Sequence, residues 1–254
     1  MSTLKRVSSK WAKTKVLIGS PFLSAHIPTT RRLTRKSLKR LLAKYGLAYV
    51  KPEEGSLGIG VMRVGRRSVQ EGLRKRTFAS YDEMYEWLRK RTAGKSYLAQ
   101  RGVRMLKLQG RPIDFRVMVQ KGRAGWKVTG TAARVAHPGK VVTNGSQGGS
   151  IHDAGGLLRR LTDAGTAIRL QRKFKRLAKA TAWRFQNAYP RMNELGLDIA
   201  VDRKRRAWIL EVNTQPDPCP FTKLADASML NEIIRYARGY GKTYALNCTK
   251  ARRG

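Results

Sequence analysis

A segment near the C-terminal end of the chain, LGLDIAVDRKRRAWILEVN, consists of two apolar runs separated by a short charged stretch. Aliphatic and β-branched residues on both sides of RKRR predict two antiparallel strands joined by a tight turn. We expect Val201 to pair with Trp208 across this turn. In that register Asp198 lies opposite Glu211, and Asn213 shares their face because side chains repeat every second residue. Three hard oxygen ligands then converge at a strand end, which suits Mg²⁺.

Two alternatives to this metal site stay open. A slip of one residue in the register would separate the three side chains, because every side chain would move to the other face. The second alternative is that Asp198 and Glu211 form ion pairs with arginine side chains, which are abundant in this chain.

The charge of the chain restricts its partners. It carries 54 Lys and Arg residues against 16 Asp and Glu, a formal net charge of +38 at pH 7. A positive field of this size attracts nucleotides, nucleic acid, anionic lipid and acidic polypeptides. We expect an anionic partner, although a solvated charged surface is the alternative, and the charge indicates no particular reaction.

Length and composition indicate a folded protein. With 254 residues and 41% hydrophobic residues, the chain can bury a core as one large domain or two lobes. No uncharged apolar run reaches about 18 residues, so no membrane span is expected, and the basic N-terminus lacks the apolar core of a secretory signal. We therefore expect an intracellular, cytoplasmic protein. Cys219 and Cys248 lack the spacing of a metal site and are expected to be reduced.

The first part of the chain predicts a small α+β unit. A short helix in SKWAKTKVL is followed by the amphipathic helix TRRLTRKSLKRLLAKYG, which Gly46 ends. The strands LAYVKP and GVMRV flank a glycine turn, and Ser80 is placed to cap a helix in SYDEMYEWLRKRT.

A larger sheet follows this unit. SYLAQRGV, PIDFRVMVQK and GWKVTGTAARVA predict strands, and ADASMLNEIIRYARGYG predicts a final helix. A long basic helix is predicted from Asp163 to Tyr189, with an apolar stripe that is expected to pack in the core. The stripe consists of Leu170, Phe174, Leu177, Ala178 and Trp183.

The glycine turn GSLGIG, residues 55–60, has two interpretations. Its glycines permit positive φ angles and let backbone N–H groups approach an anion, but the same residues make ordinary hairpins. It matches neither the P-loop nor the Rossmann pattern. Lys51, at the end of the preceding strand, is well placed to hold an α- or β-phosphate beside such a loop.

Two arginines are predicted on neighbouring strands. PIDFRVMVQ places Asp114 and Arg116 on one face of a strand, and ARVA adds Arg134 on the next. Paired arginines can neutralise charge on a transferred phosphoryl group. Asp114 is expected to orient Arg116, and ordinary surface ion pairs are the alternative for each arginine alone.

These segments, with IPTTRRLT, VTNGSQGG and WILEVNTQP in the same order, resemble the ATP-grasp superfamily and specifically its YheC/YheD group, the endospore coat-associated proteins. The resemblance runs over nearly the whole chain. At the level of motifs the chain is also similar to the ligases that add glutamate to a ribosomal protein. The resemblance implies an α+β ATP-grasp fold, with ATP bound between two lobes. Residues 1–30 would be a basic N-terminal segment, 31–96 the small lobe with the glycine loop, and 97–254 the large lobe with the Mg²⁺ and γ-phosphate sites.

The resemblance also implies roles for matching positions. Two lysines would bind phosphate, the glycine loop would close over ATP, and the hinge between the lobes would contact the edge of the adenine. The nucleotide-binding residues implied in this way are Lys10, Lys51, Gly55, Ser56, Gly58, Gly60, Gln100 and Val103. Arg116 and Arg134 would face the γ-phosphate. Asn144, with Gly148 and Gly149, fits the loop that positions the acyl-phosphate or the acceptor. Mg²⁺ would be held by Asp198, Glu211 and Asn213.

Two departures from the family pattern stand out. The hinge segment RGVRMLKLQ has no acidic residue to grip the ribose. The chain is also expected to lack the separate N-terminal domain that helps many ATP-grasp enzymes bind substrate, so these contacts would come from the two lobes, a second subunit or the partner.

The resemblance implies an ATP-dependent carboxylate–amine ligase that acts through an acyl-phosphate on an acidic peptide or another anionic polymer. The alternative is a non-catalytic, spore-associated protein of ATP-grasp type that binds nucleic acid or coat polymer. Besides the cytoplasm, the resemblance implies the forespore or the spore as a location. No oligomeric state follows from the sequence.

Overall fold

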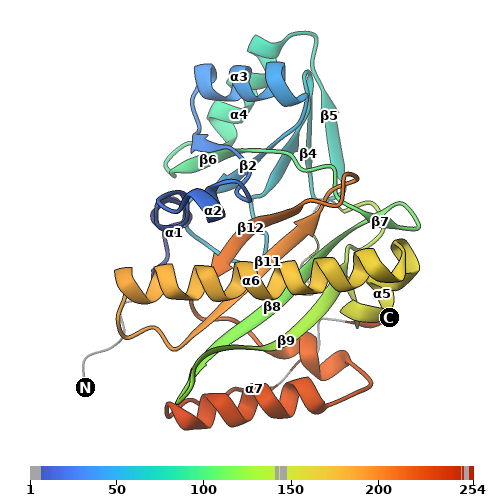
Figure 1. Ribbon diagram of the computed structural model, residues 1–254. Coiled ribbons are helices and arrows are strands. Elements are labelled where there is room, and N and C mark those ends of the chain that lie inside the picture. The colour runs from blue at the N-terminus through green and yellow to red at the C-terminus, as the bar shows by residue number, and fades with distance from the viewer. Residues whose placement is uncertain (1–6, 141–142, 144–147, 247, 249–251) are drawn as a thin grey trace.

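The computed structural model describes residues 7–140, 143, 148–246, 248 and 252–254, and these residues form two lobes, each built on its own sheet (Figure 1). The first sheet has six strands, all antiparallel to their neighbours, in the order β1-β6-β2-β3-β4-β5. Its strands are β1 (Thr30–Arg32), β2 (Ala48–Pro52), β3 (Met62–Val64), β4 (Ser68–Glu71), β5 (Arg74–Thr77) and β6 (Tyr97–Arg101).

Two helices cover this sheet, as the sequence predicted. They are α3 (Arg35–Tyr45) and α4 (Tyr81–Arg91). Gly46 ends α3 in the left-handed conformation with φ of 69°, and the Ser80 side chain accepts a hydrogen bond from the backbone of Glu83 to cap α4. Leucines of α3 and α4 pack with Val50 and Met62 into one apolar cluster.

The last strand of the first sheet leads into the connector between the two lobes. Strand β6 is hydrogen-bonded to both β1 and β2, so the first sheet extends to Arg101. The hairpin of β4 and β5 was not predicted at all. Every residue of β5 is exposed, so the apolar alternation that indicates a strand is absent there.

The second sheet has seven strands and is antiparallel except for one pair. Its order is β12-β11-β8-β9-β10-β13, with β7 beside β8, and β10 and β13 run parallel. Its strands are β7 (Lys107–Leu108), β8 (Arg111–Gly122), β9 (Gly125–Val135), β10 (Ser150–Asp153), β11 (Glu194–Val201), β12 (Ala207–Asn213) and β13 (Arg252–Arg253). The helices around it are α1 (Lys10–Ile18), α2 (Pro21–Ser24), α5 (Ala154–Leu161), α6 (Ala164–Ala188), α7 (Ser228–Gly239) and the 3₁₀ helix η2 (Cys219–Lys223).

Helix α6 crosses one face of this sheet (Figure 1), and Phe174 packs against Phe115 of β8 with ring centroids 5.0 Å apart. The predicted core stripe is confirmed for Leu170, Phe174, Leu177 and Ala178. It is wrong for Trp183, whose exposed fraction is 54%. A residue nine positions after Phe174 lies half a turn away from it on a helix of 3.6 residues per turn, so Trp183 faces outwards.

The pairing of β11 with β12 differs from the sequence prediction next to the turn but agrees with it at the two acidic residues. Val201 pairs with Ala207 and not with Trp208. A bulge between Asp198 and Ile199 then shifts the register by one residue, so that Asp198 lies opposite Glu211 after all.

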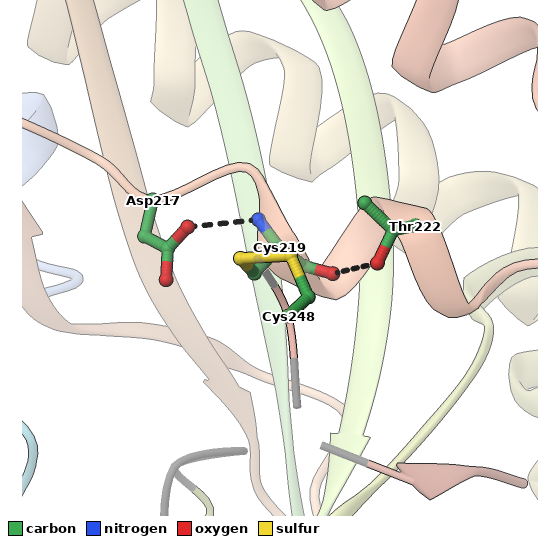
Figure 2. The surroundings of a disulfide bond; sticks show 4 residues. All are labelled: Asp217, Cys219, Thr222 and Cys248. Atoms are coloured by element: carbon green, nitrogen blue, oxygen red, sulfur yellow. Dashed lines mark hydrogen bonds between the residues drawn. A yellow bond between two sulfur atoms is a disulfide. The ribbon is translucent and has the colours of Figure 1, made fainter. Parts of the chain in front are cut away.

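The two cysteines are bonded to each other, which contradicts the prediction that they are reduced. Cys219 and Cys248 form a disulfide with a Cα–Cα distance of 5.4 Å (Figure 2). Beside it, the backbone N–H of Cys219 donates to Asp217 and the Thr222 hydroxyl donates to the carbonyl of Cys219. The prediction assumed a reducing compartment. It also had no local signal that two cysteines 29 positions apart lie next to each other in the fold.

None of the helices in the described ranges combines the length and the apolar composition that a membrane span requires.

We predict that Cys219→Ser lowers the free energy of unfolding by about 3 kcal/mol, because the disulfide restricts the unfolded chain. Urea denaturation monitored by circular dichroism measures the change. Cys248→Ser and the double variant should give the same loss as Cys219→Ser. Two reactive thiols in the unfolded, unreduced wild-type protein would show that the bond does not form.

Candidate active site

A cleft that opens to solvent lies between the two sheets. The residues that line it are Tyr49, Lys51, Gly58, Val61, Gln100 and Arg101 from the first lobe, Val103 and Met105 from the connector, and Asp114, Thr143, Asp198, Leu210 and Glu211 from the second.

One wall of the cleft is a row of charges across adjacent strands of the second sheet. Asp198 on β11 lies opposite Glu211 on β12 and opposite Arg116 on β8. Two residues along β8, Asp114 lies opposite Arg134 on β9. Because side chains alternate along a strand, all five share one face of the sheet. The predicted cluster of Asp114, Arg116 and Arg134 therefore meets the predicted acids.

Buried ion pairs hold this row together. Arg134 donates from Nε and Nη2 to the two oxygens of Asp114, both at 2.7 Å, and its Nη2 lies 3.0 Å from Asp198. Arg116 donates from Nε to Asp198 at 2.7 Å. All four side chains are buried. The expectation that Asp114 orients Arg116 is therefore wrong: Asp114 orients Arg134, and Asp198 contacts both arginines.

These contacts fix the ionisation of the acid and the base. Burial alone would raise the pKa of Asp198, but Arg116 and Arg134 outweigh it and lower the pKa to about 2. Burial opposes the charge of Arg134 as well, yet Asp114 and Asp198 raise its pKa above the ordinary value. Asp198 is consequently a carboxylate, and Arg134 a cation, at neutral pH.

The structure bears on both alternatives that the sequence left open, the register and the ion pairs. Asp198 pairs with arginine, as the alternative stated, and it still lies beside Glu211. Glu211 makes one long contact, 3.9 Å to Nζ of Lys10. Asn213 lies opposite Gly196 and donates to its carbonyl at 3.3 Å. The three predicted metal ligands are therefore neighbours on one face.

Lys51 connects the two lobes across the cleft. Its Nζ donates to Gln100 Oε1 at 3.0 Å and to the carbonyl of Leu210 at 3.1 Å. Burial, partly opposed by the carboxylate of Glu211, lowers the pKa of Lys51 to about 8. Lys51 therefore carries its charge at pH 7 and loses it in the mildly alkaline range.

Lys10 reaches the same region from the start of α1. It is buried, and its Nζ donates to the carbonyl of Gly55 in the glycine loop at 2.7 Å. One helical turn later, Lys13 is also buried and lines a smaller cavity with Lys10, Lys51 and Glu211. Sequence reasoning missed Lys13, although its three-residue spacing from Lys10 places both on one side of a helix.

The glycine loop joins β2 to β3 at the mouth of the cleft. Gly55, Gly58 and Gly60 all have positive φ, and Leu57 does too. At Gly60 a Cβ would lie about 3.0 Å from the Tyr97 hydroxyl, so a larger residue does not fit without movement. Gly58 lines the cleft, whereas Ser56 is exposed. The segment is thus a hairpin connection that also borders the site.

The hinge segment supplies an apolar end to the cleft. Val103 packs with Ala200 and Trp208. The Arg101 guanidinium, which the sequence analysis missed, lies 4.6 Å from the ring centroids of both Tyr45 and Trp208. Arg101 thus lies between one aromatic ring from each lobe. The sequence does not indicate this contact, because the two rings are far apart along the chain.

The loop before β10 is described in part. Thr143, also missed by sequence reasoning, is buried and its hydroxyl donates to Asp114. Asn144 lies outside the described residues. Gly149 passes so close to the carbonyl of Val135 that a Cβ would be 2.6 Å from it, which explains the need for glycine there.

The donor set fits Mg²⁺ held jointly by protein and ligand. Asp198, Glu211 and Asn213 supply carboxylate and amide oxygens, the hard ligands that Mg²⁺ prefers. In the described part of the chain, no group of three or more His, Cys, Asp and Glu side chains could hold a metal ion. Mg²⁺ commonly takes one or two carboxylates together with phosphate oxygens, so these residues suit a phosphate-bearing ligand.

The two lobes, with a charged cleft between their sheets, define an ATP-grasp fold. N5-carboxyaminoimidazole synthase from Aspergillus clavatus, solved with ADP, superposes with a TM-score of 0.56 at 13% identity, covering 98% of this chain and 55% of that chain. D-alanyl-alanine synthetase A from Vibrio cholerae gives a TM-score of 0.53 at 14% identity, covering 93% and 61%. These similarities confirm the α+β ATP-grasp fold predicted from the sequence.

Residues 3–243 match the family described as YheC/D like ATP-grasp, and the chain belongs to this family. The endospore coat-associated protein YheD of Bacillus subtilis (strain 168) is 26% identical over 224 residues, which cover 84% of this chain and 49% of YheD. YheC of the same strain is 24% identical over 217 residues, covering 82% and 59%. The chain thus spans about half to three fifths of the length of these curated relatives.

We predict that Arg134→Met lowers the free energy of unfolding by about 3 to 5 kcal/mol, because it leaves Asp114 without its ionic partner in a buried site. Arg235→Met is the matched control, since Arg235 pairs with Glu232 at the surface and should lose less than about 1 kcal/mol. Urea denaturation compares them, and equal losses would contradict the structural role of Arg134.

Proposed function

We propose that this chain is an ATP-dependent carboxylate–amine ligase that acts through an acyl-phosphate. The observation that carries the proposal is the row of Glu211, Asp198 and Arg116 on three adjacent strands of one cleft wall. Phosphoryl transfer needs oxygen ligands that hold a metal ion and, beside them, guanidinium groups that stabilise the transferred phosphoryl group. Membership of the YheC/D-like ATP-grasp family supports it.

The nucleotide would lie with its base at the apolar end of the cleft and its phosphates at the cationic end. Val103 and Met105 line the apolar end. Lys51 and Lys10 supply buried ammonium groups, and the glycine loop supplies a backbone that tolerates close approach. The division at residues 96 and 97 between a loop-bearing lobe and a metal-bearing lobe stays part of this proposal.

Glu211 and Asn213, together with Asp198, would hold Mg²⁺. Bound there, the ion would neutralise charge on the phosphates. The protein's own contribution is the fixed geometry of the guanidinium groups. Arg134 is held by Asp114 and Asp198, whereas Arg116 contacts Asp198 through Nε alone. We assign Arg116 to contact the transferred phosphoryl group and Arg134 to position Asp198.

The reaction would proceed in two balanced steps. A carboxylate oxygen of the substrate attacks the γ-phosphorus of ATP, the bond to the β–γ bridging oxygen breaks, and ADP leaves. The amine of the acceptor then attacks the acyl-phosphate carbon, inorganic phosphate leaves, and the nitrogen loses a proton to give an amide. Arg116 would stabilise the negative charge on the phosphoryl oxygens in both steps. Asn144 stays a proposed contact to the acyl-phosphate or acceptor.

The net charge of +38 favours an acidic peptide or another anionic polymer as the substrate. The names of the relatives YheD and YheC support a location associated with the spore.

We predict that Glu211→Ala with Asn213→Ala lowers ATP turnover at least about 100-fold, because both side chains would hold Mg²⁺. ADP release in the presence of candidate carboxylates and amines measures turnover. The matched control replaces Asn231 and Glu232, two consecutive residues of α7, by alanine. This control should keep wild-type turnover. Equal turnover in the two double variants would disprove the assignment.

We predict that affinity for Mg-ADP falls as the pH rises above about 8, by up to tenfold per pH unit. The reason is that the folded pKa of Lys51 is about 8, so its ammonium loses its proton in this range. Titration calorimetry between pH 7 and 9.5 measures the change. Lys51→Arg keeps its charge and should remove the decline, and an unchanged decline in this variant would assign it to another group.

A further inference from the structure

Helix α6 carries a row of cations on the side that faces solvent. Arg169, Arg172, Arg176 and Lys179 are exposed and follow one another at intervals of three or four residues, and exposed Trp183 continues the row. We call these five side chains the outer row of α6. At 1.5 Å per residue the row is about 21 Å long.

Carboxylates are scarce around this row, although Asp163, which caps α6, interacts electrostatically with Arg169. Helix α6 contains no Asp or Glu, and neither do α1 and α2, which pack beside it. Within the part of the chain that the structure describes, no carboxylate lies within salt-bridge distance of the four cations. Cations three or four residues apart on a helix repel one another, so the row destabilises the free helix and would be relieved by a bound polyanion.

Trp183 distinguishes this row from the other basic surfaces. Trp183 is 54% exposed, and among the described residues its ring contacts no other ring and its indole donates no hydrogen bond. Trp126 and Trp208, in contrast, donate to Gln186 and Asp202. Helix α3 is also basic, but its Arg35 is paired with Asp82 of α4.

We propose that the outer row of α6 binds single-stranded nucleic acid. The four cations, about 4.5 to 6 Å apart along the axis, contact successive phosphates, and Trp183 stacks on an unpaired base. A lipid surface fits less well, because α6 buries its apolar stripe in the core and exposes only Ile168 and Trp183 as large apolar side chains. An acidic polypeptide would pair with the cations but has no base for Trp183.

This surface is separate from the cleft. Phe115 and Val117 of β8 pack in the core beneath α6, whereas Asp114 and Arg116 point to the opposite face and line or border the cleft. The proposal therefore does not depend on the ligase activity, and a strand bound to α6 leaves the nucleotide site open.

Binding of a fluorescent 20-nucleotide oligothymidine to the whole chain over a salt series tests the proposal. We expect log affinity to fall with log salt with a slope of about −3, as four phosphate contacts on a single strand require. Arg172→Glu with Arg176→Glu should weaken binding more than about tenfold and flatten this slope. Trp183→Ala should weaken it about tenfold, and Trp183→Phe should restore most of the loss.

The control variant, Lys36→Glu with Arg40→Glu, changes the net charge equally on exposed α3 and should weaken binding less than about threefold. Circular dichroism checks that each variant is folded. An equal loss in the α3 control would overturn the proposal, because binding would then reflect net charge alone. Polyglutamate, a duplex and phosphatidylserine vesicles are also tested as competitors. If one of them displaces the oligonucleotide and Trp183→Ala has no effect on binding, the proposal is overturned in favour of that competitor.

Discussion

Asp198 is the residue on which the geometry of the cleft depends, because one carboxylate binds two guanidinium groups from two different strands. Without it, Arg116 would lose the carboxylate to which it donates, and Arg134 would be left with Asp114. The Asp198 carboxylate lies opposite Glu211, so its position also fixes how far the arginines are from the other oxygen ligands. The proposed metal and phosphoryl contacts are thus parts of one electrostatic structure, and they cannot be changed independently.

The two lobes have different parts in this structure. The larger sheet carries fixed charges, buried and paired within the sheet itself. The smaller lobe and α1 contribute lysines, whose flexible side chains reach across the cleft to carbonyl oxygens of the other lobe or of the glycine loop. The ion-paired wall therefore faces lysine ammonium groups that are themselves buried and hydrogen-bonded. The outer row of α6 lies on the other side of the sheet from these ion pairs.

Local signals in the sequence predicted much of this fold. Gly46 and Ser80 end and begin helices through chemistry confined to one turn, and the apolar period of α6 is long enough to be unambiguous. The pairs that prediction missed join distant segments: Cys219 with Cys248, Thr143 with Asp114, and Arg101 with Tyr45 and Trp208. No local rule indicates such partners, and Trp183 shows that an aromatic residue in an amphipathic helix can still face outwards.

The bulge in β12, where Leu210 is the extra residue, allows two features to vary separately that a regular hairpin would couple. The turn after Val201 sets one register, and the bulge beside Asp198 restores the register that the acids need. The length of the exposed turn and the spacing of the acidic pair are therefore free to vary separately. Evolution could lengthen or shorten the RKRR turn, and a compensating shift at the bulge would keep the acidic pair aligned.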